Sequence, residues 1–348
     1  MDNKKIRKDI PWIHLVRVIA CIMVVCLHVS TASREYYLTH SDKIFNHLAY
    51  LSTKPCVPLF FMVTGFLILP YKNGDDIKTF FKKRIPRVWF PLLFWGVVYA
   101  ILPYLLGMDD FPTMLKELIL SPIKMPDKIG GILWYLYILI GIYLFIPFLT
   151  ERIYQDKHLL LVYLSIWMVA SIVMVAKPHV PGVLGENHYE HNFNMFIYFS
   201  GYMGYLLFGF AVRKYGDILF ISRLKRGGKR KYFILLLTTF TACYAWGRFA
   251  HSFLDAGTLM MSVCVFMLLR DVNIKDGWSY RLIKHISDMS FGIYLSHIFI
   301  LKVITENIYK HVNASLYCQL LCMLLTFVCA YLLNRMLSRL PFKRYIIG

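Results

Sequence analysis

Residues 11–30 read PWIHLVRVIACIMVVCLHVS and decide the fold class. The stretch is apolar apart from His14, Arg17, His28 and Ser30, and it has the length of a helix that crosses the hydrocarbon core of a bilayer. Further apolar runs follow along the chain. Only 17% of the 348 residues are charged and 58% are apolar, against about 25% and 45–50% in a typical soluble domain. The composition argues against a soluble enzyme and predicts an all-α, polytopic membrane protein.

Hydropathy gives about ten candidate transmembrane helices along the chain. These spans are residues 11–30, 48–70, 88–107, 131–150, 159–176, 194–212, 232–248, 255–270, 289–307 and 315–337. The sequence contains no internal repeat and no soluble appendage. We therefore expect a single transmembrane domain over residues 1–348.

The basic residues set the expected orientation of these spans. If the N-terminus is cytoplasmic, 28 of the 39 Lys and Arg residues fall in inside segments and the span ends next to them, 10 fall in outside segments and the span ends next to them, and Arg17 lies within the first span. Basic loops are retained on the cytoplasmic side, so both termini are expected in the cytoplasm. The net charge of +19, including the basic stretch 223–231, then indicates contacts with membrane lipids rather than with nucleic acid.

The first span also has the outline of a signal peptide. Four basic residues lie within residues 4–8, and small residues at 30–32 resemble a cleavage site. Arg17 and His28 argue against removal, because an expendable segment has no reason to carry ionisable groups. Cleavage would leave nine spans without changing the other loops, so the loop charges do not decide between the two interpretations.

Arg17 and His28 are expected on one face of the first helix. They are eleven residues apart, which at 100° per residue is about 20° beyond three full turns and about 16 Å along the axis. Ionisable groups at membrane depth usually face a cavity or a partner. Imidazole accepts and returns protons near neutral pH, so His28 is a candidate base. The structural alternatives are a snorkelling Arg17 and a histidine that only bonds a neighbouring helix.

A second basic motif, Arg84-Ile85-Pro86-Arg87, precedes the third span. Proline is well tolerated in the first turn of a helix, and the free N–H groups of a helix start favour anions. Together with two guanidinium groups this start predicts a phosphate site. The alternative is ordinary positive-inside charge.

Other polar groups in the chain are weaker signals. Thr64 lies in the second span, and Tyr294 and His297 lie one turn apart in the ninth, where packing explains them as well as function does. The eight cysteines form no CxxC pair and indicate neither a disulfide framework nor a zinc site. We predict no metal site, because the one cluster of metal-ligand residue types lies in a loop that contains proline and glycine and is weak evidence for metal binding. Those loop residues are His179, Glu186, His188, Glu190 and His191.

Five short motifs follow one another along the chain. They are Arg17 with His28, PLFFMVTGF at 58–66, RIPR at 84–87, LWYL at 133–136 and IYLSH at 293–297. In this order they resemble the acyltransferase-3 family, multi-pass membrane acyltransferases whose members O-acetylate bacterial surface polysaccharides. The chain departs from the family pattern at Thr64, where serine is more usual, and at Ile132, where many members have histidine.

The resemblance implies acetyl transfer from cytoplasmic acetyl-CoA to a hydroxyl of a cell-surface or lipid-linked glycan, at the inner (plasma) membrane. It implies that Arg84 and Arg87 bind the phosphates of CoA and that Arg17 orients the donor or stabilises developing negative charge. His28 is then expected to deprotonate the acceptor hydroxyl or to hold the acyl group briefly. The residues expected to support this site are Thr64, Trp134, Tyr294 and His297.

The competing function is a polysaccharide exporter or flippase without acyl-transfer chemistry. Ten helices with buried histidine and arginine would suit a substrate path as well as an active site. Paired inverted repeats would favour the exporter, and the sequence does not contain them.

Overall fold

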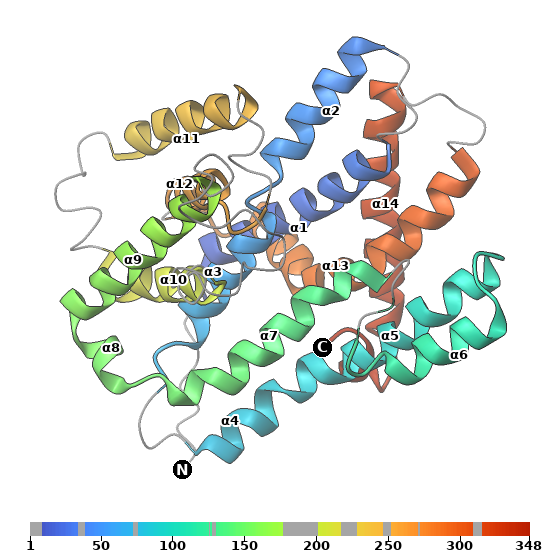
Figure 1. Cartoon of the computed structure of the whole chain (residues 1–348), viewed down its shortest axis with the longest axis horizontal. Coiled ribbons are helices and arrows are strands. Elements are labelled where there is room, and N and C mark those ends of the chain that lie inside the picture. The colour runs from blue at the N-terminus through green and yellow to red at the C-terminus, as the bar shows by residue number, and fades with distance from the viewer. Residues whose placement is uncertain are drawn as a thin grey trace.

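Figure 1 shows the chain as a computed structural model, which describes residues 9–33, 39–71, 76–124, 126, 130–176, 201–216, 228–245, 252–270, 272–308 and 315–348. Throughout these residues the regular structure is helical, and none of them forms a strand. The prediction of an all-α fold is confirmed.

The helices are labelled as in Figure 1. In chain order they are α1 (Pro11–Ala32), α2 (His40–Ser52), α3 (Cys56–Ile68), α4 (Ile77–Arg84), α5 (Pro86–Leu105), α6 (Phe111–Leu120), α7 (Trp134–Phe145), α8 (Glu151–Gln155), α9 (Lys157–Ala176), α10 (Met203–Gly216), α11 (Gly228–Ala245), α12 (Ala256–Leu269), α13 (Trp278–Ile308), α14 (Leu316–Leu337) and α15 (Lys343–Ile346). Two short 3₁₀ turns flank α7, at Gly130–Leu133 and Ile146–Phe148.

Six helical segments in the described part of the chain are long and apolar enough to cross a membrane. They are Pro11–Ala32, His40–Ile68, Ile77–Leu105, Gly131–Phe148, Trp278–Thr305 and Leu316–Leu337. Two further apolar segments, Lys157–Ile172 within α9 and Ala256–Leu269 of α12, overlap the fifth and eighth predicted spans. The predicted spans 194–212 and 232–248 lie partly outside the described residues. The multi-pass architecture is supported, while the count of ten and the cytoplasmic termini stay predictions.

Helix α1 lies at the centre of the bundle, where it contacts α2, α3, α12, α13 and α14 (Figure 1). These neighbours bury most of its apolar side chains. The outer helices instead expose apolar side chains, as expected where lipid replaces water. Examples are Val162 and Val169 on α9, Leu235 and Leu237 on α11, and Leu321, Leu324 and Leu332 on α14.

Helices α3 and α10 approach so closely that both need glycine at the contact. A Cβ atom on Gly65 would lie 1.8 Å from the backbone oxygen of Leu206, and one on Gly209 would lie 1.9 Å from that of Met62. A backbone oxygen cannot rotate away as a side chain can. This contact gives the glycine of the PLFFMVTGF motif a packing role, in the manner of small residues between membrane helices.

We expect Gly65→Ala to destabilise the protein by at least about 1–3 kcal/mol, the usual cost of overpacking. Gly141→Ala on α7 is the matched control, because a Cβ there meets nothing within 4 Å and alanine favours the helix. Thermal unfolding of the detergent-solubilised protein measures both changes. Equal melting temperatures for Gly65→Ala and the parent would contradict the packing described.

Candidate active site

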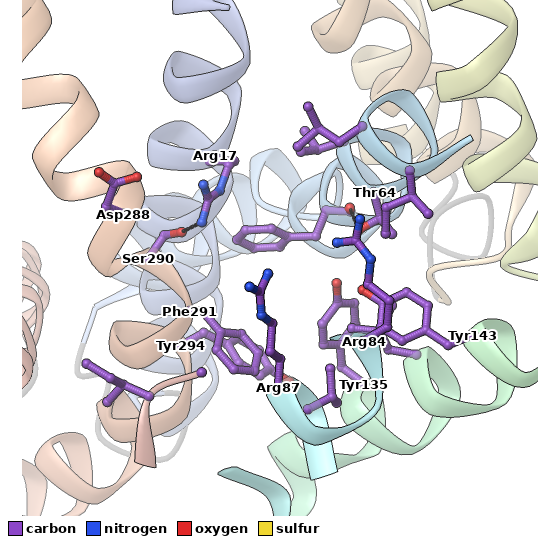
Figure 2. Close-up of a pocket in the computed structure, with 18 residues that line it drawn as sticks. Arg17, Thr64, Arg84, Arg87, Tyr135, Tyr143, Asp288, Ser290, Phe291 and Tyr294 are labelled. Atoms are coloured by element: carbon purple, nitrogen blue, oxygen red, sulfur yellow. Dashed lines mark hydrogen bonds between the residues drawn. The ribbon is translucent and has the colours of Figure 1, made fainter. Parts of the chain in front are cut away.

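A cavity of about 340 Å³ lies between α1, α3, α4, α5, α7 and α13 (Figure 2). Its polar lining includes Arg17, Thr64, Arg84, Arg87, Asp288 and Ser290, and its aromatic lining includes Phe60, Tyr135, Tyr143, Phe291 and Tyr294. The cavity thus collects five of the eight residues predicted for the site. The three that do not line it are His28, Trp134 and His297.

Three guanidinium groups from three different helices converge on this cavity. Figure 2 shows Arg17, Arg84 and Arg87 directed toward the same space. Among the described lining residues, Asp288 supplies the one side-chain carboxylate, and it is exposed. The excess of positive charge favours an anionic ligand, and planar guanidinium forks suit phosphate oxygens in particular.

The two arginines of the RIPR motif lie on either side of a helix joint. Helix α4 ends at Arg84 and α5 begins at Pro86, so Arg87 stands in the first turn of the new helix. The carboxylate of Asp76 caps the start of α4 by accepting from the N–H groups of Lys78 and Thr79 at 3.1 Å each. The predicted helix start at the motif is confirmed.

Arg17 turns toward α13 and lines the cavity. Its Nη2 donates to Ser290 Oγ at 3.1 Å, and that hydroxyl donates in turn to the backbone oxygen of Ser287 at 2.7 Å. The serine therefore fixes one edge of the guanidinium. The rest of the group faces the space that Arg84 and Arg87 also line (Figure 2).

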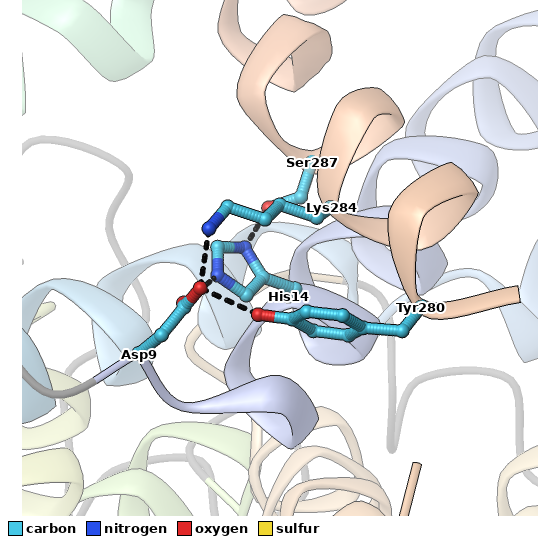
Figure 3. A network of polar contacts seen from close by, with 5 residues as sticks. All are labelled: Asp9, His14, Tyr280, Lys284 and Ser287. Atoms are coloured by element: carbon cyan, nitrogen blue, oxygen red, sulfur yellow. Dashed lines mark hydrogen bonds and ion pairs between the residues drawn. The ribbon is translucent and has the colours of Figure 1, made fainter. Parts of the chain in front are cut away.

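A polar network at the start of α1 ties the same two helices together (Figure 3). The Asp9 carboxylate accepts from the Tyr280 hydroxyl and the Lys284 ammonium. It also pairs with His14 Nε2 at 2.6 Å, and His14 Nδ1 lies 2.9 Å from Ser287 Oγ. The next polar contact along both helices is the arginine–serine bond just described. Helices α1 and α13 therefore run parallel, and the network fixes the register that aims the arginine into the cavity.

The Asp9 network predicts a stability loss in acid. The hydrogen bond from Lys284, and next that from Tyr280, hold the pKa of Asp9 below its ordinary value of 3.8. A carboxylate with a lowered folded-state pKa stabilises the fold above the unfolded value, and this contribution disappears as the pH falls below 3.8. The side chain is 40% exposed, so solvent screening keeps the contribution below about 1 kcal/mol.

We expect Asp9→Asn to lower the melting temperature slightly at about pH 7 and to reduce the further loss between about pH 5 and pH 3. Asp276→Asn, which removes an exposed carboxyl from the turn before α13, serves as the control. Thermal unfolding across this pH range gives the comparison. Identical acid profiles for Asp9→Asn and the parent would show that the network adds no stability.

His28 and His297 form a second polar centre beside the cavity. Their ring centroids are 5.1 Å apart, with the histidine of α1 half-buried and that of α13 fully buried. Both Arg17 and His28 thus face α13, as the helical spacing predicts. The expectation that both side chains line one passage is not met by the described cavity. Tyr294 borders both places, because its ring lines the cavity and its centroid lies 5.9 Å from that of His297.

The remaining two predicted residues have separate surroundings. Thr64 lines the cavity, and its hydroxyl donates to the backbone oxygen of Phe60 at 2.8 Å. Trp134 starts α7 outside the cavity, where it stacks on Phe253 with ring centroids 5.6 Å apart and also contacts Tyr202. Its contacts are those of a packing residue in an aromatic cluster.

The sequence interpretation missed Tyr143, Asp288 and Ser290 as parts of the cavity wall. One available signal was the spacing of Ser287, Ser290 and Tyr294 at three and four residues, which places polar groups on one face of a helix. The metal-ligand loop with His179 and the neighbouring histidines lies outside the described residues.

Comparisons with known proteins agree with this architecture. A family model described as an acyltransferase domain, that of the acyltransferase-3 family, matches residues 10–335, which include both arginine motifs and both histidines. No curated protein and no solved structure matches the chain. The six membrane-length helices and the extent of the family match together indicate a multi-pass membrane acyltransferase. The chain belongs to the acyltransferase-3 family.

Proposed function

We propose that the protein is an O-acetyltransferase of the inner (plasma) membrane that moves an acetyl group from cytoplasmic acetyl-CoA to a hydroxyl of a cell-surface or lipid-linked glycan. The observation that carries the proposal is the convergence of Arg17, Arg84 and Arg87 on one cavity. The positive-inside rule assigns the helix ends around this cavity to the cytoplasm, the side on which acetyl-CoA is made.

The cavity suits the phosphate end of the donor. Each guanidinium can give two parallel N–H bonds to phosphate oxygens, and a volume of about 340 Å³ falls in the range of small-molecule sites. Tyr135, Tyr143 and Phe291 add aromatic surface to the wall. The pantetheine arm would run from the arginines along the parallel helices α1 and α13 toward the two histidines.

The reaction then takes place at the histidine pair. The acceptor hydroxyl gives its proton to an imidazole nitrogen of His28 as its oxygen attacks the thioester carbonyl. The C–S bond breaks, and the CoA thiolate takes the proton back as it leaves. Transfer by way of an acyl group held on His28 gives the same products in two steps, and both routes fit the arrangement.

The family match favours acyl transfer over the polysaccharide exporter. We expect acetyl-CoA to raise the melting temperature of the detergent-solubilised protein, because a ligand that binds only the folded state stabilises it. We also expect mass spectrometry of surface polymers to find one acetyl increment that is missing from cells without the protein. Absence of both the stabilisation and the acetyl increment would contradict the proposal.

A further inference from the structure

His297 is held in one tautomer by the turn of helix on which it stands. Its Nδ1 lies 2.6 Å from the backbone oxygen of Tyr294. A carbonyl oxygen only accepts hydrogen bonds, so Nδ1 carries the proton and donates. In the neutral ring, Nε2 is therefore left with a lone pair and can only accept.

That accepting nitrogen has no partner in the described structure. His297 is fully buried, and its Nε2 makes no hydrogen bond to any described residue. A buried acceptor without a hydrogen bond is destabilising, so an apolar side chain of similar size would suit packing alone better. We therefore expect a hydrogen-bond donor to reach Nε2 of His297 during the reaction.

A candidate donor beside it is the imidazole of His28. The two ring centroids are 5.1 Å apart and the planes are tilted by 49°. Rings at this distance are close enough for a hydrogen bond between them to form on reorientation, and catalytic hydrogen bonds commonly tighten only when substrate is bound. His28 is half-buried, whereas His297 is fully buried.

We propose that His297 is the positioning residue for His28. This inference rests on the proposed function, in which His28 is the base, and adds that His297 orients it. Nε2 of His297 accepts the N–H of one ring nitrogen of His28, which leaves the other ring nitrogen unprotonated and aimed at the acceptor hydroxyl. When that nitrogen takes the hydroxyl proton, the same hydrogen bond stabilises the imidazolium until the proton passes to the departing thiolate.

Three substitutions at position 297 separate this role from packing. His297→Gln keeps an acceptor oxygen close to the place of Nε2, whereas His297→Asn keeps only a donor toward Tyr294, and His297→Leu keeps neither. The control is His285→Leu, which also removes from α13 a histidine whose Nε2 is buried and has no partner among the described residues. His285 packs against Tyr331 of α14 instead, with ring centroids 5.8 Å apart.

The assay uses membrane vesicles that contain the full chain, with transfer of radiolabelled acetyl from acetyl-CoA into the glycan fraction as the readout. We expect His297→Leu and His297→Asn to lower kcat by about 10–100-fold, as is usual for residues that orient a reacting ligand, with KM for acetyl-CoA unchanged. We expect His297→Gln to recover most of this loss and His285→Leu to match the parent.

The outcomes distinguish the two levels of the proposal. No transfer by the parent protein overturns the proposed function itself. Transfer by the parent, with parental kcat in His297→Leu, overturns the positioning role alone. An equal loss of kcat in His297→Gln, His297→Asn and His297→Leu would assign His297 to packing and would also overturn the positioning role. A kcat that recovers in His297→Gln and in neither of the other two variants supports the positioning role.

Discussion

Replacing His28 with alanine is expected to lower kcat for acetyl transfer by about 10²–10⁴-fold, the usual contribution of a general base. The donor should still bind, because His28 lies outside the arginine-lined cavity. The acetyl-CoA-dependent rise in melting temperature is therefore expected to match that of the parent. Purified protein assayed for transfer and for thermal stabilisation provides both readouts.

The control for this substitution is His47→Ala. His47 lies on α2, and its ring contacts Tyr244 at a centroid distance of 5.6 Å, away from both the cavity and the histidine pair. It is expected to keep the parental kcat. A His28→Ala protein that is folded, binds acetyl-CoA and transfers acetyl groups at the parental rate would falsify the assignment of this residue as the base.

The second large effect is expected from the paired substitution of Arg84 and Arg87 by glutamine. A hydrogen bond to a charged group contributes about 1.5–3 kcal/mol, and loss of both arginines is expected to raise KM for acetyl-CoA by at least about 10²-fold. Since neither side chain reaches the histidine pair, kcat at saturating donor should change much less.

Lys82 and Lys83 offer a matched pair for this experiment. They stand on α4 directly before Arg84, they are exposed, and they do not line the cavity. The substitution of both by glutamine removes the same amount of positive charge from the same helix. If the two double substitutions raise KM for acetyl-CoA equally, the RIPR motif acts only as positive-inside charge. The phosphate site then lies elsewhere in the protein.

The features of the site that could be predicted are those encoded within a single helix. The spacing of Arg17 and His28 places both on the face that meets α13, and the proline of the RIPR motif marks the start of α5. Such features follow from the geometry of one helix. They need no knowledge of how helices pack.

The cavity itself could not be predicted, because it depends on which helices meet. Ser290 is separated from Arg17 by 273 residues, and many helix faces with small and polar side chains could have met that arginine equally well. Hydropathy also finds apolar runs without their exact helical length. For example, the predicted span 255–270 forms a helix over Ala256–Leu269 only.

The distance in sequence between α1 and α13 has a consequence for biogenesis. The first helix carries Arg17 and His28 and enters the bilayer long before Ser290 is translated, because Arg17 and Ser290 are 273 residues apart. At about 5–20 residues per second this delay is tens of seconds. During that time Arg17 has no partner from α13, and an unpaired arginine costs up to roughly 2.5–3.5 kcal/mol, the value for the membrane centre. Assembly of the bundle therefore finishes late, and nascent chains that stop before α13 present an uncompensated cation to insertion factors and membrane proteases.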